Sequence, residues 1–387
     1  MKILQVTAFF SPVYGGSAEA PYQLSRELAK RGHEVTLYTS DFKLGREYIL
    51  SIPEVKTYAF KTWLGFAEFH VTPGMIKKTK DEIRQFDIIH MHNYRTFQNI
   101  ITHHYAKKHG VPYVVQAHGS LATFFQKGWL KRIFDVAFGY RILKNASKVI
   151  TGCGMEVDEH QEIGVNRDKI ALIPPAYGIE EFSQLPSPGR FRHKFDVEKK
   201  HIVLFLGRLH KIKGIDFLIR AFHELIRERD DVVLAIAGPG DGYGAILRKL
   251  VSRLDLSHKV LFTGYLSGVD KLSALVDADM LVQTSMYERG PGSPFEAILC
   301  GTPIIITRDT GAGEIAGKID AGYLVEYGNI EELTAAMKKI LDDPAEALDK
   351  TQKAKHHIMA NLCWEKIVDL YESLYESVIE LGEGNSA

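Results

Sequence analysis

The chain is 387 residues long and carries 48 Lys and Arg against 48 Asp and Glu, so its formal net charge at pH 7 is zero. A neutral chain has no overall field that would attract nucleic acid or a membrane surface. With 45% hydrophobic and 25% charged residues, the composition is that of a soluble globular protein, and the length suits two domains.

The first half of the chain alternates short apolar runs with helical stretches. Helices are predicted at 20–32 and 126–145, and strands at 2–10, 34–40, 86–92, 112–118, 148–153 and 169–175. Strands that alternate with helices indicate βαβ units and a parallel sheet. The polar segment 183–200, rich in Lys, Arg and Pro, is the predicted linker.

The same alternation restarts after the linker. Strands are predicted at 201–207, 232–238, 259–264, 279–285 and 303–307, with helices at 214–228 and 294–301. We therefore expect an α/β fold of two Rossmann-like, doubly wound parallel-sheet domains, 1–182 and 201–362, facing across a cleft. The last helix, in 363–387, has one apolar face and is expected to pack back towards the first domain.

The three cysteines, Cys153, Cys300 and Cys363, show neither a paired nor a metal-binding spacing. This pattern favours a reduced, cytoplasmic location. The first apolar run is too short for a signal peptide, and we find no run of about 18 apolar residues that would span a bilayer.

A basic loop follows the first strand of the second half. GRLHKIKG (207–214) puts Arg208 and Lys213 at the carboxyl edge of the predicted sheet, where open α/β sheets bind ligands. Two cations beside the free amides of a helix suit a diphosphate, although a solvated basic loop has the same composition.

Two glycine-rich turns also follow strands. AGPGDG (237–242) contains Gly238 and would let the backbone approach a phosphate or ribose, but it lacks the dinucleotide and P-loop spacings. Gly15 and Gly16 would either bring amides to an anion or simply turn the chain.

Two patterns imitate metal sites. His90 and His92 share one face of a strand, but no third ligand is near in sequence, so hydrogen-bonded structural histidines are the favoured interpretation. Asp277 and Asp279 form a D-x-D pattern where a helix passes into a strand. Asp279 is better explained as an acceptor for local backbone amides, and we predict no metal at either place.

The stretch YERGPGSPFE (287–296) holds two glutamates around a tight turn. Ser293 and Glu296 fit a capping box, and Gly301 fits the helix stop. Glu296 thus has a structural explanation, whereas Glu288, at the end of an apolar strand, has none. The stretch therefore favours Glu288 as a functional residue and leaves Glu296 undecided.

Taken in order, these motifs resemble the retaining glycosyltransferases of family 4, which have the GT-B fold. The resemblance rests on the Glu-x7-Glu of 288–296 after GRLHKIKG, AGPGDG and FTGYLS, and on the first-strand glycines, FDIIHMHN and the terminal CWEKIVDLYESLY. It covers nearly the whole chain.

The resemblance implies a metal-independent transfer of a sugar from a nucleoside-diphosphate sugar, most often a UDP- or GDP-sugar, to a glycan or lipid-linked acceptor. Arg208 and Lys213 would stabilise the diphosphate, Glu288 would hold a sugar hydroxyl, and Glu296 would hold the ribose. His118 would reach the donor sugar. Further donor contacts would come from Gly15, Gly16, Gly238, Tyr265, Leu266, Gly290, Gly292 and Ser293.

The same family favours a front-face reaction, so Glu288 would be a clamp and not half of a hydrolytic carboxylate pair. The chain departs from the family in two places. IPPAYGIEEF (173–182) replaces the usual P-N-G-[IV]-D, and Gly-Pro-Gly (290–292) replaces a Gly-Phe-Gly-like core. The stiffer turn is expected to alter sugar preference.

The basic segment 126–148 interleaves Lys and Arg with Trp129, Phe134 and Phe138. It would lie on an anionic membrane at the inner face of the cell, or pack into the core with lysines reaching solvent. Two rival functions remain open. One is a sugar-nucleotide epimerase of the same fold, and the other is a non-catalytic subunit that binds a sugar nucleotide.

Overall fold

The computed structural model describes residues 1–11, 16–66, 69–121, 128–198, 200–240 and 242–384. It divides into two compact units, Met1–Ala176 with Cys363–Ala387 and Tyr177–Leu362. The predicted linker 183–200 belongs to the second unit, and the terminal helix belongs to the first. Within the described residues, none of the helices combines the length and the apolar character needed to cross a bilayer.

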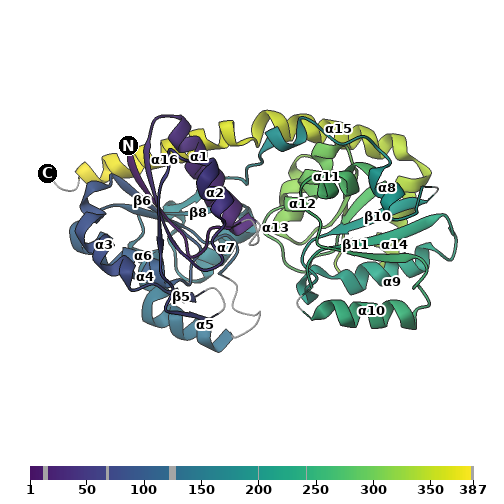
Figure 1. The fold of residues 1–387 in the computed structure, drawn as a ribbon, viewed down its shortest axis with the longest axis horizontal. Helices are drawn as coiled ribbons and strands as arrows, with labels where there is room; N and C mark the ends of the chain where they lie inside the picture. The colour runs from purple at the N-terminus through teal and green to yellow at the C-terminus, as the bar shows by residue number, and fades with distance from the viewer. Residues whose placement is uncertain (12–15, 67–68, 122–127, 199, 241, 385–387) are drawn as a thin grey trace. The chain divides into compact units, whose positions relative to one another are not determined.

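The first unit is built on a parallel sheet of seven strands over the described residues, in the order β3-β2-β1-β6-β7-β8-β9. Strands β6 and β8 of this sheet are labelled in Figure 1. Its strands are β1 Lys2–Val6, β2 Glu34–Ser40, β3 Lys56–Phe60, β6 Ile88–His92, β7 Tyr113–Gln116, β8 Lys148–Thr151 and β9 Ile170–Leu172, with a separate antiparallel hairpin of β4 Leu64–Phe66 and β5 Phe69–Val71. Its helices are α1 Gly16–Lys30, α2 Arg46–Ser51, α3 Gly74–Glu82, α4 Phe97–His109, α5 Gly128–Phe134, α6 Tyr140–Asn145, α7 Gly154–Glu162 and α16 Trp364–Gly384.

The second unit repeats the plan with a six-stranded parallel sheet, in the order β12-β11-β10-β13-β14-β15 over the described residues. Its strands are β10 His201–Leu206, β11 Val232–Ala237, β12 Val260–Gly264, β13 Met280–Gln283, β14 Ile304–Thr307 and β15 Tyr323–Val325. Its helices are α8 Arg190–Lys194, α9 Ile215–Leu225, α10 Tyr243–Arg253, α11 Gly268–Asp277, α12 Gly292–Cys300, α13 Gly311–Lys318, α14 Ile330–Asp342 and α15 Pro344–Asn361. The prediction of two doubly wound parallel sheets is confirmed.

Each sheet reverses its strand order at one point, between β1 and β6 in the first unit and between β10 and β13 in the second. At such a point the loops after the two neighbouring strands lead to opposite faces of the sheet. The carboxyl ends of the two strands then border a crevice, which is where open α/β sheets place their ligands. The loops after β1, β6, β10 and β13 are therefore the expected ligand-binding loops of the two sheets.

The basic segment after residue 127 is helical but not uniform. Helix α5 has no buried residue, a π-helical turn follows at Asp135–Gly139, and α6 then buries Ile142 and Leu143. Gly139 lets this turn pack closely against Tyr94, because a Cβ there would lie 2.3 Å from the Tyr94 hydroxyl. The two interpretations of this segment, membrane contact and core packing, therefore each fit a different part of it. Its first part is exposed, and its second part packs into the core.

Candidate active site

The reversal point of the second sheet brings the basic loop beside the first glutamate of the Glu-x7-Glu pair. Lys213 lies in the loop after β10, and Glu288 follows β13, the neighbouring strand. The Lys213 ammonium forms an ion pair with Glu288 Oε2, and their side chains are only 19% and 21% exposed. Residues that are 75 positions apart thus form one half-buried charged pair.

Two polar side chains from the end of β13 complete the surroundings of that carboxylate. Gln283 Nε2 and Ser285 Oγ donate to the same oxygen, Glu288 Oε2, over 3.4 and 3.3 Å. Neither residue was singled out from the sequence. Their i, i+2 spacing at a strand end, with a glutamate three residues further on, was the available signal.

Gly214 holds the basic loop against β13. Its backbone is left-handed, with φ of 60°, and an added Cβ would lie 2.1 Å from the Thr284 carbonyl oxygen. The Thr284 hydroxyl donates to the Gly214 carbonyl over 2.9 Å. This close contact fixes the position of Lys213 relative to the strand that precedes Glu288.

Arg208 is exposed, and in the described part of the chain its guanidinium makes no ion pair.

Gly238 has a packing role of its own, because a Cβ there would lie 1.8 Å from the Gly207 carbonyl oxygen. The glycine is therefore needed for the approach of the loop after β11 to the loop after β10, whatever else it contacts.

A hollow of about 370 Å³ lies beside these loops within the second unit. Its lining combines glycines with apolar and aromatic side chains, namely Leu209, Ile236, Gly238, Gly240, Gly242, Gly244, Ala245, Arg248, Phe262 and Gly264. The Arg248 guanidinium lies 4.1 Å from the centroid of the Phe262 ring. Directly after Gly264, Tyr265 is 63% exposed and Leu266 is buried. Such a lining suits a flat, partly apolar group.

The turn before α12 differs from the predicted capping box. The helix begins at Gly292 with Pro291 at its N-cap, and no side chain caps it. Ser293 Oγ instead donates to the Leu206 carbonyl over 2.9 Å, at the end of β10. The capping-box prediction is therefore wrong, because a tertiary contact takes the serine hydroxyl. The predicted stop at Gly301 is confirmed by its left-handed backbone, with φ of 89°.

The loop that replaces the family's P-N-G-[IV]-D supports this turn. Tyr177 is buried, and its hydroxyl donates to the Pro291 carbonyl over 3.3 Å. Its ring centroid lies 5.4 Å from that of Phe295 in α12. The two departures from the family pattern, in 173–182 and in 290–292, are thus in direct contact.

Glu296 takes part in a second charged group. Lys271 lies 3.3 Å from Glu296 Oε1 and 3.1 Å from Glu181 Oε1. Burial by itself would lower the pKa of Lys271, but the two carboxylates outweigh it and raise the pKa. Glu181 belongs to the same loop as Tyr177, so this loop contacts α12 at two points.

In the first unit, His118 follows β7 and has the left-handed backbone that is uncommon outside glycine, with φ of 49°. Its Nε2 lies 2.9 Å from His92 Nδ1. Burial lowers the pKa of His118 to about 4, so the ring is neutral at neutral pH. Gly16 is exposed at the start of α1, whereas Gly15 lies outside the described residues.

The two metal-like patterns have other partners. His90 Nδ1 bonds the Tyr375 hydroxyl at 2.7 Å, and His92 bonds Gln5 and His118. Asp277 accepts from the amides of Gly189, Phe191 and Arg192 at the start of α8. Across the described ranges, no cluster of three or more potential metal ligands occurs.

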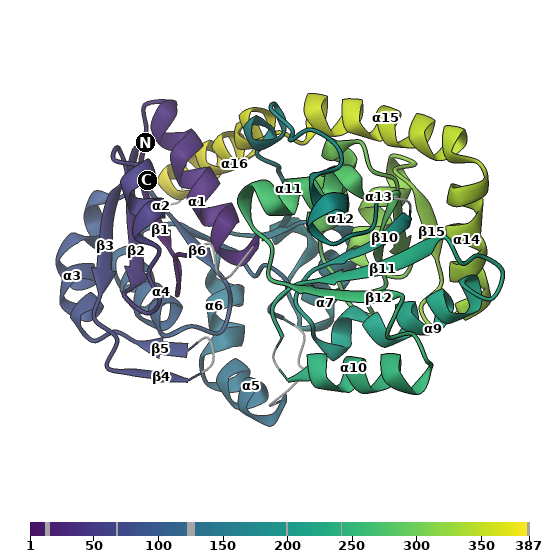
Figure 2. The ribbon, with the colours of Figure 1, turned by 45° about the vertical axis from the view of Figure 1, so that its right-hand side comes forward.

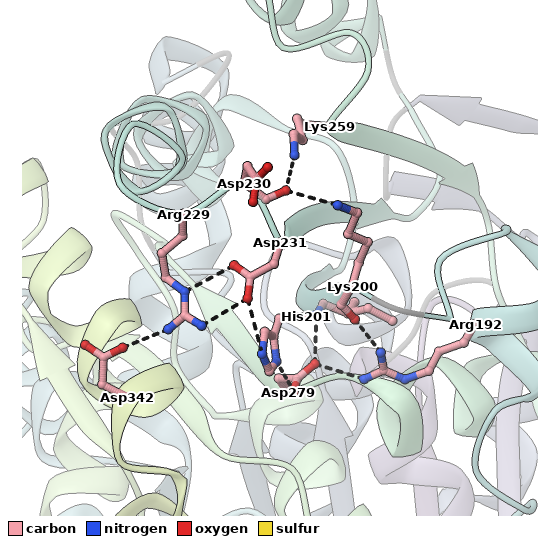
Figure 3. Close-up of polar contacts among 10 residues, drawn as sticks. Arg192, Lys200, His201, Arg229, Asp230, Asp231, Lys259, Asp279 and Asp342 are labelled. Carbon is pink, nitrogen blue, oxygen red and sulfur yellow. Dashed lines mark hydrogen bonds and ion pairs between the residues drawn. The ribbon is translucent and has the colours of Figure 1, made fainter.

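Figure 3 shows Asp279 between the Arg192 guanidinium, at 2.9 Å, and His201 Nδ1, at 2.8 Å. Asp279 Oδ2 also accepts from the Ile202 amide over 2.8 Å. Asp279 therefore accepts from a backbone amide, as predicted, but that amide is 77 positions away, so the prediction that it serves local amides is wrong. This network lies where β10 and β13 begin, at the edge of the sheet opposite the Lys213–Glu288 pair.

Comparison with known families and structures shows which proteins this chain resembles. Residues 190–357 match the family Glycosyl transferases group 1, and residues 14–181 match Glycosyltransferase Family 4. The N-acetyl-alpha-D-glucosaminyl L-malate synthase of Bacillus anthracis is 25% identical over 95% of each chain. An uncharacterised glycosyltransferase of Methanocaldococcus jannaschii is 27% identical over 98% of this chain and 99% of its own.

Among solved structures, Anabaena HepE in complex with UDP and glucose superposes with a TM-score of 0.79 and 19% identity, covering 97% of this chain and all of HepE. Sucrose-phosphate synthase from Thermosynechococcus elongatus superposes with a TM-score of 0.76 over 98% of this chain. These likenesses establish the fold, and the two family matches together cover most of the chain. The chain belongs to the group 1 glycosyltransferases of family 4, enzymes with the GT-B fold that transfer glycosyl groups.

Proposed function

We propose that this enzyme moves a sugar, with retention of anomeric configuration, from a nucleoside-diphosphate sugar to a hydroxyl group of a glycan or lipid-linked acceptor. The half-buried pair of Lys213 and Glu288 at the reversal point of the second sheet carries the proposal. HepE, which has the same fold, was crystallised with UDP and with UDP-glucose. A UDP- or GDP-sugar is the proposed donor.

In this proposal Lys213 and Arg208 bind the diphosphate and stabilise the charge that develops as the bond between the anomeric carbon and the phosphate oxygen breaks. The acceptor oxygen attacks the same face of the sugar, and its proton passes to an oxygen of the departing diphosphate. No divalent cation is required. Glu288 holds a sugar hydroxyl, with its carboxylate oriented by Gln283 and Ser285.

The remaining predicted donor contacts belong to the same proposal. We propose that the base occupies the glycine-lined hollow next to Tyr265 and Leu266, and that Glu296 accepts from the ribose hydroxyls. The backbone of Gly290, Gly292 and Ser293 would contact the sugar and phosphate, where helix amides favour an anion.

A peripheral membrane contact is the proposed route to a lipid-linked acceptor, at the inner face of the membrane. Trp129 and Ile133 on α5 are 66% and 58% exposed beside Lys131 and Arg132. The β4–β5 hairpin lies beside α5, since the ring centroids of Phe69 and Phe134 are 6.2 Å apart (Figure 2). Trp63, which precedes this hairpin, is 75% exposed. Exposed aromatic and basic side chains together suit an anionic lipid surface.

Vesicle sedimentation tests the membrane contact. Replacing Trp129 and Ile133 together by serine should weaken binding to phosphatidylglycerol vesicles about tenfold, since two large apolar groups no longer enter the interface. Leu348→Ser, at an exposed position of α15 in the second unit, is the matched control. Equal binding of all three proteins would contradict the membrane contact.

Nucleotide release decides between the proposed transferase and its rivals. Purified protein is incubated with UDP-, GDP- and ADP-sugars, with and without a panel of glycan and lipid-linked acceptors. A transferase frees the nucleoside diphosphate chiefly when the acceptor is present. Conversion of the donor sugar without release would indicate an epimerase, and donor binding with neither reaction would indicate a binding subunit.

A further inference from the structure

A row of uncharged polar side chains crosses three neighbouring strands of the first unit. Gln5 lies on β1, His92 on β6, and His118 directly after β7, and these strands pair in that order. His92 Nε2 lies 2.6 Å from Gln5 Oε1, and His92 Nδ1 lies 2.9 Å from His118 Nε2. Gln5 and His92 are fully buried.

The protons of this row can be assigned in order. Burial, together with the neighbouring imidazoles, lowers the pKa of His92 well below its usual value, and burial lowers that of His118 to about 4. Each ring is therefore neutral at neutral pH and carries one proton. Because the Gln5 carbonyl oxygen can only accept, His92 Nε2 holds the proton and His92 Nδ1 is a lone pair. His118 Nε2 must then donate to His92, which leaves a lone pair on His118 Nδ1.

The backbone that carries His118 is held by the side chains of Glu156 and Arg95. Glu156 Oε1 accepts from the Gly119 amide over 3.0 Å. Arg95 donates to the Leu121 carbonyl over 2.9 Å and pairs with Asp135 at 2.7 Å. These contacts support the strained, left-handed conformation at His118, and such strain is typical of functional sites. The imidazole thus has both a fixed position and a fixed proton.

We infer that Gln5 and His92 are positioning residues that fix the tautomer of His118, so that His118 Nδ1 accepts a hydrogen bond from a hydroxyl group of the sugar. The identification of the ligand as a sugar hydroxyl rests on the proposed function, whereas the tautomer assigned to His118 is independent of it. A lone pair repels an anion, so His118 contacts a hydroxyl and not the diphosphate. Among the described residues, no protein group bonds His118 Nδ1, which leaves this atom for the ligand.

Nuclear magnetic resonance reads the tautomer directly. Full-length protein labelled with ¹⁵N-histidine is studied at pH 7.5 without any donor, and His118→Gln assigns the His118 signals. Wild-type protein should show a protonated Nε2 and a bare Nδ1. Gln5→Met removes the acceptor of His92 and should leave His118 as a mixture of tautomers. Tyr371→Phe removes a neighbouring buried hydrogen bond, to Gln116, and should leave the spectrum unchanged.

A proton on His118 Nδ1 in the wild type overturns the inference, as does an unchanged His118 tautomer in Gln5→Met. Should Gln5→Met fail to fold, the wild-type spectrum decides alone. Because no donor is present, the result is independent of the proposed transfer. A bare Nδ1 in a protein that transfers no sugar would disprove the function and leave the tautomer assignment standing.

Kinetics then test the ligand. Donors lacking one sugar hydroxyl at a time are compared, and one of them should lose about tenfold in kcat/KM with wild-type enzyme, as expected for one hydrogen bond. Gln5→Met should reduce that discrimination, and His118→Ala should abolish it. Undiminished discrimination in His118→Ala would show that His118 binds no sugar hydroxyl.

Discussion

The two sheets share one plan but differ in the chemistry at their reversal points. In the second unit this edge is charged, with Lys213 paired to Glu288 and Arg208 exposed nearby. In the first unit it is uncharged at neutral pH, with Gln5, His92 and His118 joined by hydrogen bonds. Fixed charge suits a diphosphate, whereas a neutral row suits hydroxyl groups. The same fold thus supplies two kinds of recognition, and the following changes test that division in order of decreasing expected effect.

Lys213→Ala should have the largest effect. It removes the cation proposed to stabilise the leaving diphosphate and leaves Glu288 without its ion-pair partner. We expect kcat/KM for transfer to fall about 1,000-fold, with a clear loss of nucleotide affinity, since the removal of one such preorganised group has this magnitude. Lys211→Ala, an exposed position in the same loop, is the control. Comparable turnover in both variants would contradict the role of Lys213.

Glu288→Gln should lower transfer about 100-fold while nucleotide affinity changes much less, because Glu288 is proposed to hold the sugar and not the diphosphate. Steady-state kinetics and calorimetric titration of the nucleoside diphosphate measure the two quantities separately. A parallel loss of nucleotide binding and turnover would place Glu288 at the diphosphate instead.

Acid should destabilise the first unit before the second. Burial lowers the pKa values of His90, His92, His118 and His160, all in the first unit. Below about pH 6.5 the unfolded chain protonates these rings, while folded His118 remains neutral down to about pH 4. The unfolded state then binds more protons, so the stability conferred by the neutral rings is lost as the pH falls through this window.

Hydrogen exchange at pH 7.5 and pH 5.5, corrected for intrinsic rates, measures this difference. Protection should fall first in β1, β6 and β7. Earlier loss of protection in β10 and β13 would reverse the expected order and contradict the assignment of the neutral row.

Tyr177→Phe should have the smallest effect. It removes only the hydroxyl that donates to the Pro291 carbonyl, a loss of about 1 kcal/mol of support for the turn before α12. We expect KM for the donor to rise about fivefold with little change in kcat. Unchanged donor KM would show that the turn keeps its position without Tyr177.

The alternation of strands and helices in the sequence predicts both sheets, because its periodicity is local. Contacts between distant segments were not predictable in this way. Ser293 has the local pattern of a capping residue, yet its hydroxyl bonds Leu206 on a neighbouring strand. Lys213 and Glu288 were each recognised, but their pairing depends on strand order, which single segments do not encode. His92 was weighed only as a metal ligand or structural residue, because its partner Gln5 is 87 positions away.

The central claim is that the donor nucleotide binds at the charged edge of the second sheet. Hydrogen exchange with and without saturating UDP or GDP tests it most directly in the full-length wild-type protein. The prediction is new protection in the loop 207–214 and in residues 286–293, with no change around Asp279 at the opposite edge. Protection confined to other segments, with these two unchanged, would contradict the claim.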